Sequence, residues 1–218
     1  MLAPDEGTAA VRLARQALQA TFHVLPGVES AAEVEGSRLP RVFDEPRGAF
    51  VTLKRHPSGS LRGCIGYPLP VLPLRSAVVR AAVSAALEDY RFRPVTPAEL
   101  PRIAIEVSVL TAPVPLNFSS AREAIEAVKV GRDGLIVDGL GSSGLLLPQV
   151  APEEGWSAEE LLDGTCEKAG LPPKSWQDPR VKVRRFEAEV YRELAPGGEV
   201  VREEPSAATS GGPRARKT

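Results

Sequence analysis

The chain has few of the residues that usually build metal or disulfide centres. Its two cysteines and two histidines are too few for a disulfide scaffold, an iron–sulfur protein or a histidine-rich metal enzyme. Aromatic residues make up only 5%, which argues against base-stacking platforms for nucleic acid. There is no positive excess, because 27 Lys and Arg face 28 Asp and Glu for a net charge of −1. A dedicated binder of nucleic acid or acidic membranes is therefore not expected.

The sequence also has no pattern typical of targeting or of a membrane span. Residues 1–7 carry acidic rather than basic side chains, and Arg12 and Arg15 interrupt the apolar stretch that follows, unlike in a signal peptide. The most apolar window, residues 71–87, contains two arginines and cannot cross a bilayer. We therefore expect a cytoplasmic protein without membrane attachment, a setting that also suits isolated cysteines.

What is present fits a folded protein. Apolar residues make up 43% and charged residues 25%, both near the globular average. At roughly 150 residues per domain, the 218 residues form one large domain or two small ones. Residues 195–218 are rich in Gly, Pro, Ser and Ala, and we expect them to be a disordered tail. The folded domain is then expected over residues 8–194.

Hydrophobic spacing predicts a hairpin, a helix and a strand in each half of the chain, in that order. The expected helices cover 8–21, 72–88, 121–128 and 158–169, and the expected strands cover 49–55, 61–67, 103–110 (half-buried), 135–137, 145–147 and 181–191. Residues 23–47 are expected to form a loop. The repeated order predicts an α+β fold of two packed subdomains, approximately 8–112 and 113–194. Each is expected to be a mainly antiparallel sheet with helices on one face, and the subdomains need not be continuous in sequence.

Residues 139–144 match G-x-G-x-x-G, the pattern of dinucleotide-binding loops. That pattern requires a strand before it and a helix after it, and here Pro148 prevents the helix. We interpret the segment as a hairpin loop and expect no cofactor. No C-x-x-C, H-x-H or H-E-x-x-H occurs, so no metal site is expected either.

The two cysteines have different surroundings. Cys166 shares one apolar helix face with Leu162 and Ala169, so we interpret it as part of the core. Cys64 instead lies in the sequence Leu-Arg-Gly-Cys-Ile-Gly at residues 61–66. Glycines in a strand are typical of places where a ligand or another backbone approaches closely.

Arg62 is two residues from Cys64 and therefore on the same face of the expected strand. A nearby guanidinium favours the thiolate. The residues leave two interpretations open: a functional thiol, or a tight hairpin in which Gly63 and Gly66 make room for a helix.

We expect no catalytic Cys–His pair. If residues 57–60 form the turn, His56 pairs with Leu61 and Leu53 pairs with Cys64, which separates His56 from Cys64 by roughly 10 Å. The odd separation also places the two side chains on opposite faces. His23 cannot be placed from the sequence. At the end of the long helix, Asp89 or Glu88 has the chemistry of an acid or base, although a carboxylate–arginine pair that ends the helix is the favoured interpretation.

With these residues placed, the chain resembles the AMMECR-one domain family, whose prokaryotic members are also known as AmmeMemoRadiSam system protein A. The hexapeptide at 61–66 is the family's hallmark, and the similarity runs in order from about residue 8 to 194. Tyr90 departs from the pattern, since the family usually has proline there. The matching segments include 50–54, 89–95, 99–100, 105–110, 134–137, 146–151, 168–171, Trp176 and 186–193.

The resemblance implies an α+β fold of two unequal, packed subdomains, and it implies no settled reaction. It also suggests a role beside a Memo-like protein and a radical-SAM enzyme. The family's motif positions would carry any site. They are Cys64, Arg62 and Asp89 as candidate catalytic residues and Gly63, Gly66, Arg91 and Gln149 as candidate binding residues. We hypothesise that Cys64 and Gln149 border one cleft between the subdomains.

Two functions follow as hypotheses. The first is an enzyme, or a subunit of one, that uses the Cys64 thiol with Arg62 as its electrostatic partner. The alternative is a non-catalytic binding or adaptor module whose cleft holds a peptide or a small molecule, because no acid–base pair can be placed beside the thiol.

Overall fold

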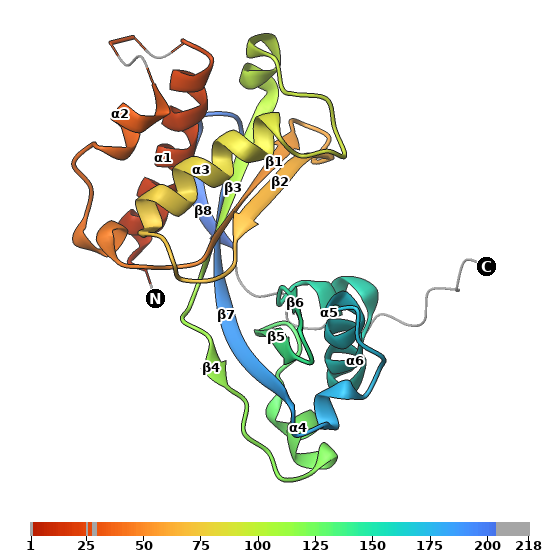
Figure 1. Ribbon diagram of the computed structural model, residues 1–218. Helices are drawn as coiled ribbons and strands as arrows, with labels where there is room; N and C mark the ends of the chain where they lie inside the picture. Colours follow the sequence, from red (N-terminus) through yellow and green to blue (C-terminus); the bar gives the residue numbers. More distant parts are fainter. Residues whose placement is uncertain (1, 25, 28–29, 204–218) are drawn as a thin grey trace. The chain divides into compact units, whose positions relative to one another are not determined.

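The computed structural model describes residues 2–24, 26–27 and 30–203, and it shows an α+β protein of antiparallel strands and helices (Figure 1). The chain forms two compact units: Met1–Ala112 with Glu189–Glu203, and Pro113–Ala188. Strand β7 (Val181–Glu193) gives its first residues to the second unit and its last residues to the first. The expectation of a separate sheet in each half was wrong, because the strands form one antiparallel sheet through β7. The packing of two subdomains on each other stays a prediction.

The first unit packs helices against one face of its strands (Figure 1). Its strand order is β2-β1-β3-β7, and β8 pairs with the far end of β7. The elements are α1 (Pro4–Thr21), α2 (Ala31–Glu35), η1 (Arg41–Asp44), β1 (Ala49–Arg55), β2 (Leu61–Tyr67), α3 (Leu74–Leu87), η2 (Pro97–Arg102), β3 (Ile103–Leu110) and β8 (Val200–Glu203). Alternation along β1 buries Ala49, Val51 and Leu53 in the core with α1 and α3.

A buried ion pair joins α1 to the last residue of β7. Arg15 pairs with Glu193, and both side chains are almost fully buried. The guanidinium also donates to the Ile103 carbonyl over 2.6 Å, and Glu193 accepts the Ile105 N–H over 3.0 Å. Because these bonds satisfy both charges, the pair is tolerated inside the unit.

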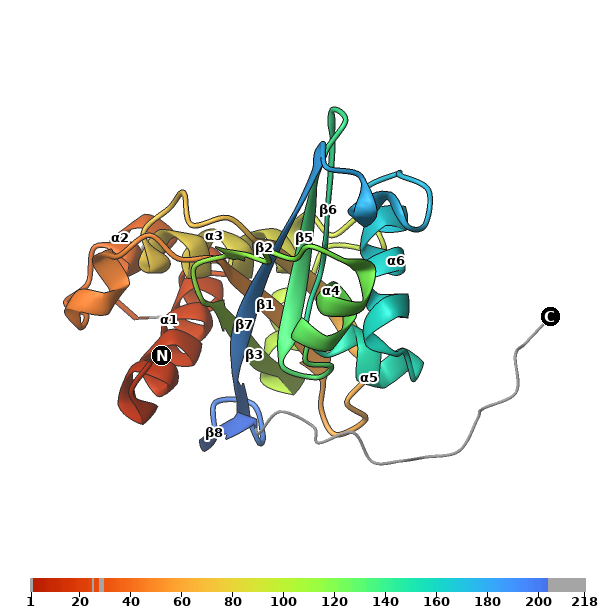
Figure 2. The same ribbon diagram turned by 90° about the horizontal axis from the view of Figure 1, so that it is seen from below.

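The second unit repeats this plan with β5, β6 and the first part of β7. Its strand order is β7-β5-β6, and the short β4 pairs with the other edge of β7. The elements are β4 (Val114–Pro115), α4 (Ala121–Ala127), β5 (Asp133–Gly139), β6 (Ser142–Leu146), α5 (Val150–Glu154), α6 (Ala158–Lys168) and η3 (Ser175–Gln177). Figure 2 shows α4, α5 and α6 on the same side of β5 and β6.

The two hairpins share a detail of packing. Gly63 of β2 lies opposite Leu53, and a Cβ added to it would be 2.1 Å from the Ala85 carbonyl oxygen of α3. Gly144 of β6 lies opposite Val137, and its added Cβ would be 2.3 Å from the Ala169 nitrogen at the end of α6. In each unit, a glycine in the second hairpin strand thus lets a helix later in the chain approach the sheet.

Most elements form where the sequence predicts them, and β1, β2 and β3 have the expected bounds. The glycine-rich segment contains the expected hairpin turn, with positive φ at Leu140 and Gly141 as in a type I′ turn. The turn is shorter than expected, because β5 extends to Gly139 and β6 begins at Ser142. In the part of the chain that the structure describes, no helix is both long and apolar enough to cross a bilayer.

Several expectations were wrong. The first helix begins at Pro4, where Glu6 accepts the Ala3 N–H over 2.7 Å. The expected loop over 23–47 contains α2 and η1. Strand β3 is buried on both faces rather than on one, since Glu106 is paired with Lys54 over 2.6 Å and Ser108 is buried.

The expected tail is also too long. Residues 200–203 form β8, which pairs with β7 from Val190↔Glu203 to Glu193↔Val200, so the ordered chain continues to Glu203. Residues 189–193, expected in the second subdomain, belong to the first unit. The rest of the expected tail, residues 204–218, lies outside the described residues.

Candidate functional site

The site begins with strand β2, which lies at the end of the strand order of the first unit. Gly63 faces α3, so by alternation Cys64 faces away from that helix. Arg62 is the residue that the bulge in this hairpin leaves without a cross-strand partner, so the shared face of Arg62 and Cys64 stays a prediction. Gly66 lies opposite Phe50, and a Cβ added to Gly66 would be 2.2 Å from the phenyl ring. Both glycines therefore have a packing role, while their role in binding stays a prediction.

Cys64 is half-buried and has Thr52 as its cross-strand neighbour. The Thr52 hydroxyl donates a hydrogen bond to the Cys64 sulfur over 3.2 Å. A hydrogen bond from a hydroxyl stabilises a thiolate more than it stabilises a neutral thiol. The thiol is thus partly accessible and already has a hydrogen-bond donor.

The segment after α3 holds the outer edge of β2 at Cys64. The Cys64 N–H donates to Asp89 Oδ2 over 2.8 Å, and Arg91 donates to the Cys64 carbonyl over 3.3 Å. Asp89 and Arg91 also form a two-point ion pair at 2.9 and 2.7 Å. Both backbone groups of Cys64 on this edge are therefore fixed.

These contacts set the charge of the Asp89 carboxylate. Hydrogen bonds from the Arg91 side chain, and then from the Cys64 N–H, hold the pKa of Asp89 well below its usual range against the effect of burial. The pKa of Arg91 is raised in turn, mainly by Asp89 and to a smaller extent by the charge of Cys64. Asp89 is therefore ionised near neutral pH and orients the strand, and it is too weak a base to activate the thiol by itself.

Arg62 is buried and has a carboxylate partner of its own. Its guanidinium donates to Glu99 over 2.9 and 3.2 Å, and it lowers the pKa of Glu99 to about 2. The Phe92 ring lies 6.0 Å from the Arg62 guanidinium and 5.6 Å from that of Arg91, within the range of cation–π attraction. Because Glu99 neutralises Arg62, its action on the thiol stays a prediction.

The structure thus brings Arg62, Cys64, Asp89 and Arg91 together in the first unit. Gln149 precedes α5 in the second unit, and the cleft that was expected to unite it with Cys64 stays a prediction. Among the described residues there is no group of three His, Cys, Asp or Glu side chains that could hold a metal ion.

The predicted register of the first hairpin was wrong by one residue. Cys64 lies opposite Thr52 rather than Leu53. Leu61 pairs with Lys54 rather than His56, a shift of two residues at the turn, and the bulge next to Leu53 reduces the shift to one. His56 is four residues beyond Thr52, roughly 13 Å along an extended chain, and it is exposed. The distance therefore still excludes a Cys64–His56 pair, whereas the argument from opposite faces was wrong, because the separation from Thr52 is even.

The comparison with known proteins identifies the family. The AMMECR1 family model matches residues 11–191, which include every residue of this cluster. The chain belongs to the AMMECR1 family.

Archaeal AMMECR1 relatives are similar over nearly their whole length. Protein MJ0810 of Methanocaldococcus jannaschii is 46% identical over 92% of this chain and 96% of its own. A protein of Thermococcus gammatolerans is 49% identical over 88% of this chain and 92% of its own. The crystal structure of the uncharacterized protein PH0010 from Pyrococcus horikoshii has a TM-score of 0.78 at 41% identity, covering 93% of this chain and 98% of that one.

Two hydrogen-bond partners in the group of residues around Cys64 were not predicted from the sequence. Thr52 touches the thiol, and its polar side chain within an apolar strand was the available signal. Glu99 pairs with Arg62, and the capping pattern from Thr96 to Glu99 marked its turn without revealing the partner. Cys166 is buried in the second unit, as expected for a core residue.

Proposed function

We propose that this chain is an enzyme, or a subunit of one, that uses the Cys64 thiol. We further propose that it works in a cytoplasmic modification pathway with Memo-like and radical-SAM proteins. The observation that carries the proposal is the Thr52 hydroxyl, which donates to a half-buried sulfur on a strand whose backbone is fixed at that residue. A nucleophile needs both access and a fixed position.

The charges around the thiol support this proposal. Arg91 lies beside Cys64, because its guanidinium donates to the Cys64 carbonyl over 3.3 Å. A positive group near sulfur favours the thiolate, which is the reactive form. In the proposal Thr52 and Arg91 stabilise the thiolate, Asp89 positions Arg91, and Arg62 with Glu99 holds the neighbouring turn.

The rate of thiol alkylation tests the proposal. We would measure the reaction with iodoacetamide at neutral pH in a Cys166→Ala background, so that only Cys64 reacts. Thr52→Val should slow the reaction several-fold, because it removes the hydroxyl that donates to the sulfur, and Thr52→Ser should retain the parent rate. A rate that Thr52→Val leaves unchanged would overturn the proposal.

A second candidate is the binding or adaptor module. The observation that favours it is the absence, among the described contacts of Cys64, of a side chain able to take its proton near neutral pH. Asp89 is a weak base, and His23 and His56 are exposed elsewhere. Cys64→Ser separates the two functions, since it should abolish modification by a thiol enzyme while reducing a module's affinity for the Memo-like protein only slightly. Calorimetric titration of that protein supplies the affinity.

A further inference from the structure

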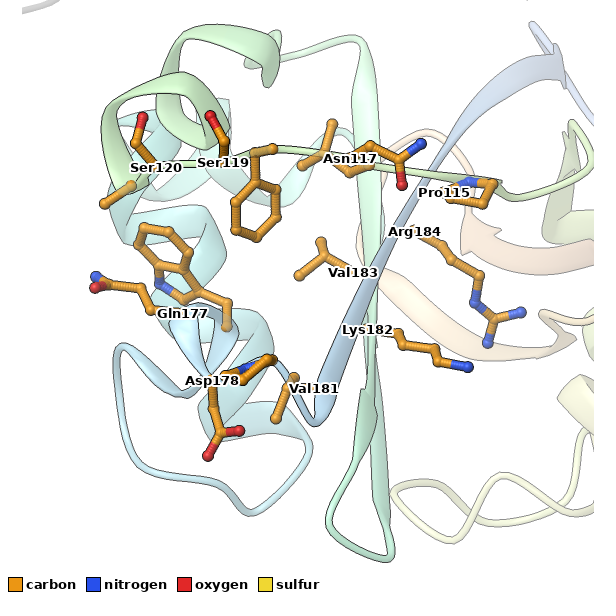
Figure 3. A pocket seen from close by; sticks show the side chains of 15 residues that line it. Pro115, Asn117, Ser119, Ser120, Gln177, Asp178, Val181, Lys182, Val183 and Arg184 are labelled. Carbon is orange, nitrogen blue, oxygen red and sulfur yellow. The ribbon is translucent and has the colours of Figure 1, made fainter.

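A pocket of about 770 Å³ lies in the second unit (Figure 3). None of its lining residues belongs to the group around Cys64. Residues 115–121 form one wall and residues 176–184 form the other. The pocket lies along strand β7 where β4 ends. All of its lining residues belong to the second unit, so it is complete within that unit.

The pocket exposes an unpaired strand edge. One edge of β7 pairs with β5 from Val181 to Glu187, but β4 covers only Arg184 and Arg185 on the other edge. Beyond β4, the Leu116 N–H donates to the Val183 carbonyl over 2.9 Å. Alternate residues of a strand direct both backbone groups to the same edge, so Val181 faces this edge as well. The described hydrogen bonds leave the Val183 N–H and the Val181 carbonyl without a partner there.

The two sides of this edge differ in chemistry. Val181 and Val183 point to one side and belong to the apolar cluster that includes Trp176, with Phe118 packed against it. The Phe118 and Trp176 rings lie 6.1 Å apart, edge to face. Lys182 and Arg184 point to the opposite side of the strand (Figure 3). A chain lying on this edge would therefore meet an apolar wall on one side and cations on the other.

The carboxylates around the pocket leave positive charge available. Asp178 lines the pocket but is held by Arg180 in an ion pair of 2.7 Å that lowers its pKa to about 2. Arg184 approaches Asp138 only to 3.5 Å, and both side chains are partly exposed. Lys182 is exposed, and Asp138 lies opposite it on β5. One carboxylate thus lies beside two cations.

We propose that this edge of β7 binds an extended segment of a partner protein in which apolar and acidic side chains alternate. The segment adds a strand to β7, and the Val183 N–H and Val181 carbonyl supply hydrogen bonds to its backbone. Its side chains alternate between the two faces, as in any strand, so its apolar residues reach Phe118 and its acidic residues reach Lys182 and Arg184. The chain's own end has the wrong charge for this position, because its last five residues are Arg-Ala-Arg-Lys-Thr.

Peptide binding tests whether the bound segment is acidic and whether its apolar and acidic residues alternate. The probe is a fluorescein-labelled peptide of alternating valine and glutamate, blocked at both ends and followed by fluorescence polarisation. It should bind at least about tenfold more tightly than the same peptide with lysine for glutamate, as two partly exposed charge pairs would give. A peptide of the same composition with its valines and glutamates in separate blocks should bind weakly. No binding, or equal binding of acidic and basic peptides, would overturn the proposal.

Two further comparisons identify the edge itself. The double variant Lys182→Glu with Arg184→Glu should reverse the preference toward the lysine peptide. The matched control is Arg122→Glu, because Arg122 is highly exposed on α4 and does not line the pocket. Two further peptides carry N-methyl groups on either the odd-numbered or the even-numbered amides. One of them should lose binding and the other should keep it, because only alternate amides of an added strand face β7. Equal binding by the two methylated peptides would contradict an added strand at this edge. A dimer in sedimentation that the double variant dissociates would contradict a partner protein there.

Discussion

The backbone N–H of Cys64 donates a hydrogen bond to the carboxylate of Asp89 over 2.8 Å. The bond joins the cysteine of β2 to the turn that follows α3, on the outer edge of the strand. The Asp89 carboxylate orients the main chain of Cys64. Thr52 instead contacts the Cys64 sulfur, and Arg91 contacts the Cys64 carbonyl. This division between positioning and electrostatic groups underlies the first prediction.

Asp89→Asn should reduce stability at neutral pH by about 1–3 kcal/mol, because it weakens the bonds of a buried carboxylate to Arg91 and to Cys64. The folded-state pKa of Asp89 is lowered, so its contribution is complete above the unfolded pKa near 4 and declines as the pH falls further. The parent should lose this increment in acid, and the variant should show a flatter dependence. Urea unfolding from pH 3 to pH 7 measures both. Glu154→Gln, at an exposed carboxylate, is the control, and parallel curves for the parent and Asp89→Asn would contradict the prediction.

The two thiols should react with a disulfide reagent at very different rates. Cys64 is half-buried, whereas Cys166 is fully buried and has a pKa raised mainly by burial. One thiol should therefore react quickly in the native protein, and the second only as the protein opens or in guanidinium. Cys64→Ser should remove the fast phase, and Cys166→Ala the slow one. Two fast phases in the native protein would show that Cys166 is accessible.

Gly63→Ala and Gly144→Ala should each cost at least about 1–3 kcal/mol, since the added methyl group meets helix backbone rather than a flexible side chain. Gly36→Ala is the matched control, because its added Cβ would lie 3.5 Å from the nearest atom and its φ of −74° suits alanine. We expect a change within about 0.5 kcal/mol there. Thermal and urea unfolding of the three variants provide the comparison, and equal costs at all three sites would disprove the close-approach argument.

Asp163→Ala should destabilise the second unit by about 1–3 kcal/mol, because it leaves the buried Trp176 indole N–H without its acceptor at 2.7 Å. Burial alone would raise the pKa of Asp163, but the bonds from Trp176 and Lys174 together lower it. Glu159→Ala removes the exposed bond to Lys174 and serves as the control, with an expected cost below about 1 kcal/mol. Urea unfolding followed by tryptophan fluorescence measures the difference, and a similar cost for the two variants would contradict it.

Elements with a strong hydrophobic period could be predicted from the sequence. The expected bounds of β1 and β3 and the expected start of α6 at residue 158 agree with the structure. The short helices α2 and α5 could not be predicted in the same way. Each has five residues, too few to form without tertiary contacts, and neither has a long apolar stripe.

The candidate site was predictable only where it depends on local geometry. A separation of two residues predicts that Arg62 and Cys64 share one face of a regular strand, but the bulge at Arg62 interrupts that regularity. The bond from Cys64 to Asp89 depends instead on the path of the chain after α3, and the pair of Arg62 with Glu99 joins residues that are 37 positions apart. The turn moved the register by two residues and the bulge next to Leu53 reduced the shift to one, and no pattern in the sequence marks either change.

The buried pair of Arg15 and Glu193 has a consequence for the protein's synthesis. The two residues are 178 positions apart, and Glu193 also completes the bonding of β3 through Ile105. At roughly 5–20 residues per second, a ribosome adds Glu193 on the order of ten seconds or more after Arg15. During that interval the nascent N-terminal half carries a cation whose partner does not yet exist. The first unit is therefore expected to finish folding only after Glu193 has been synthesised, with its helices exposed to chaperones until then.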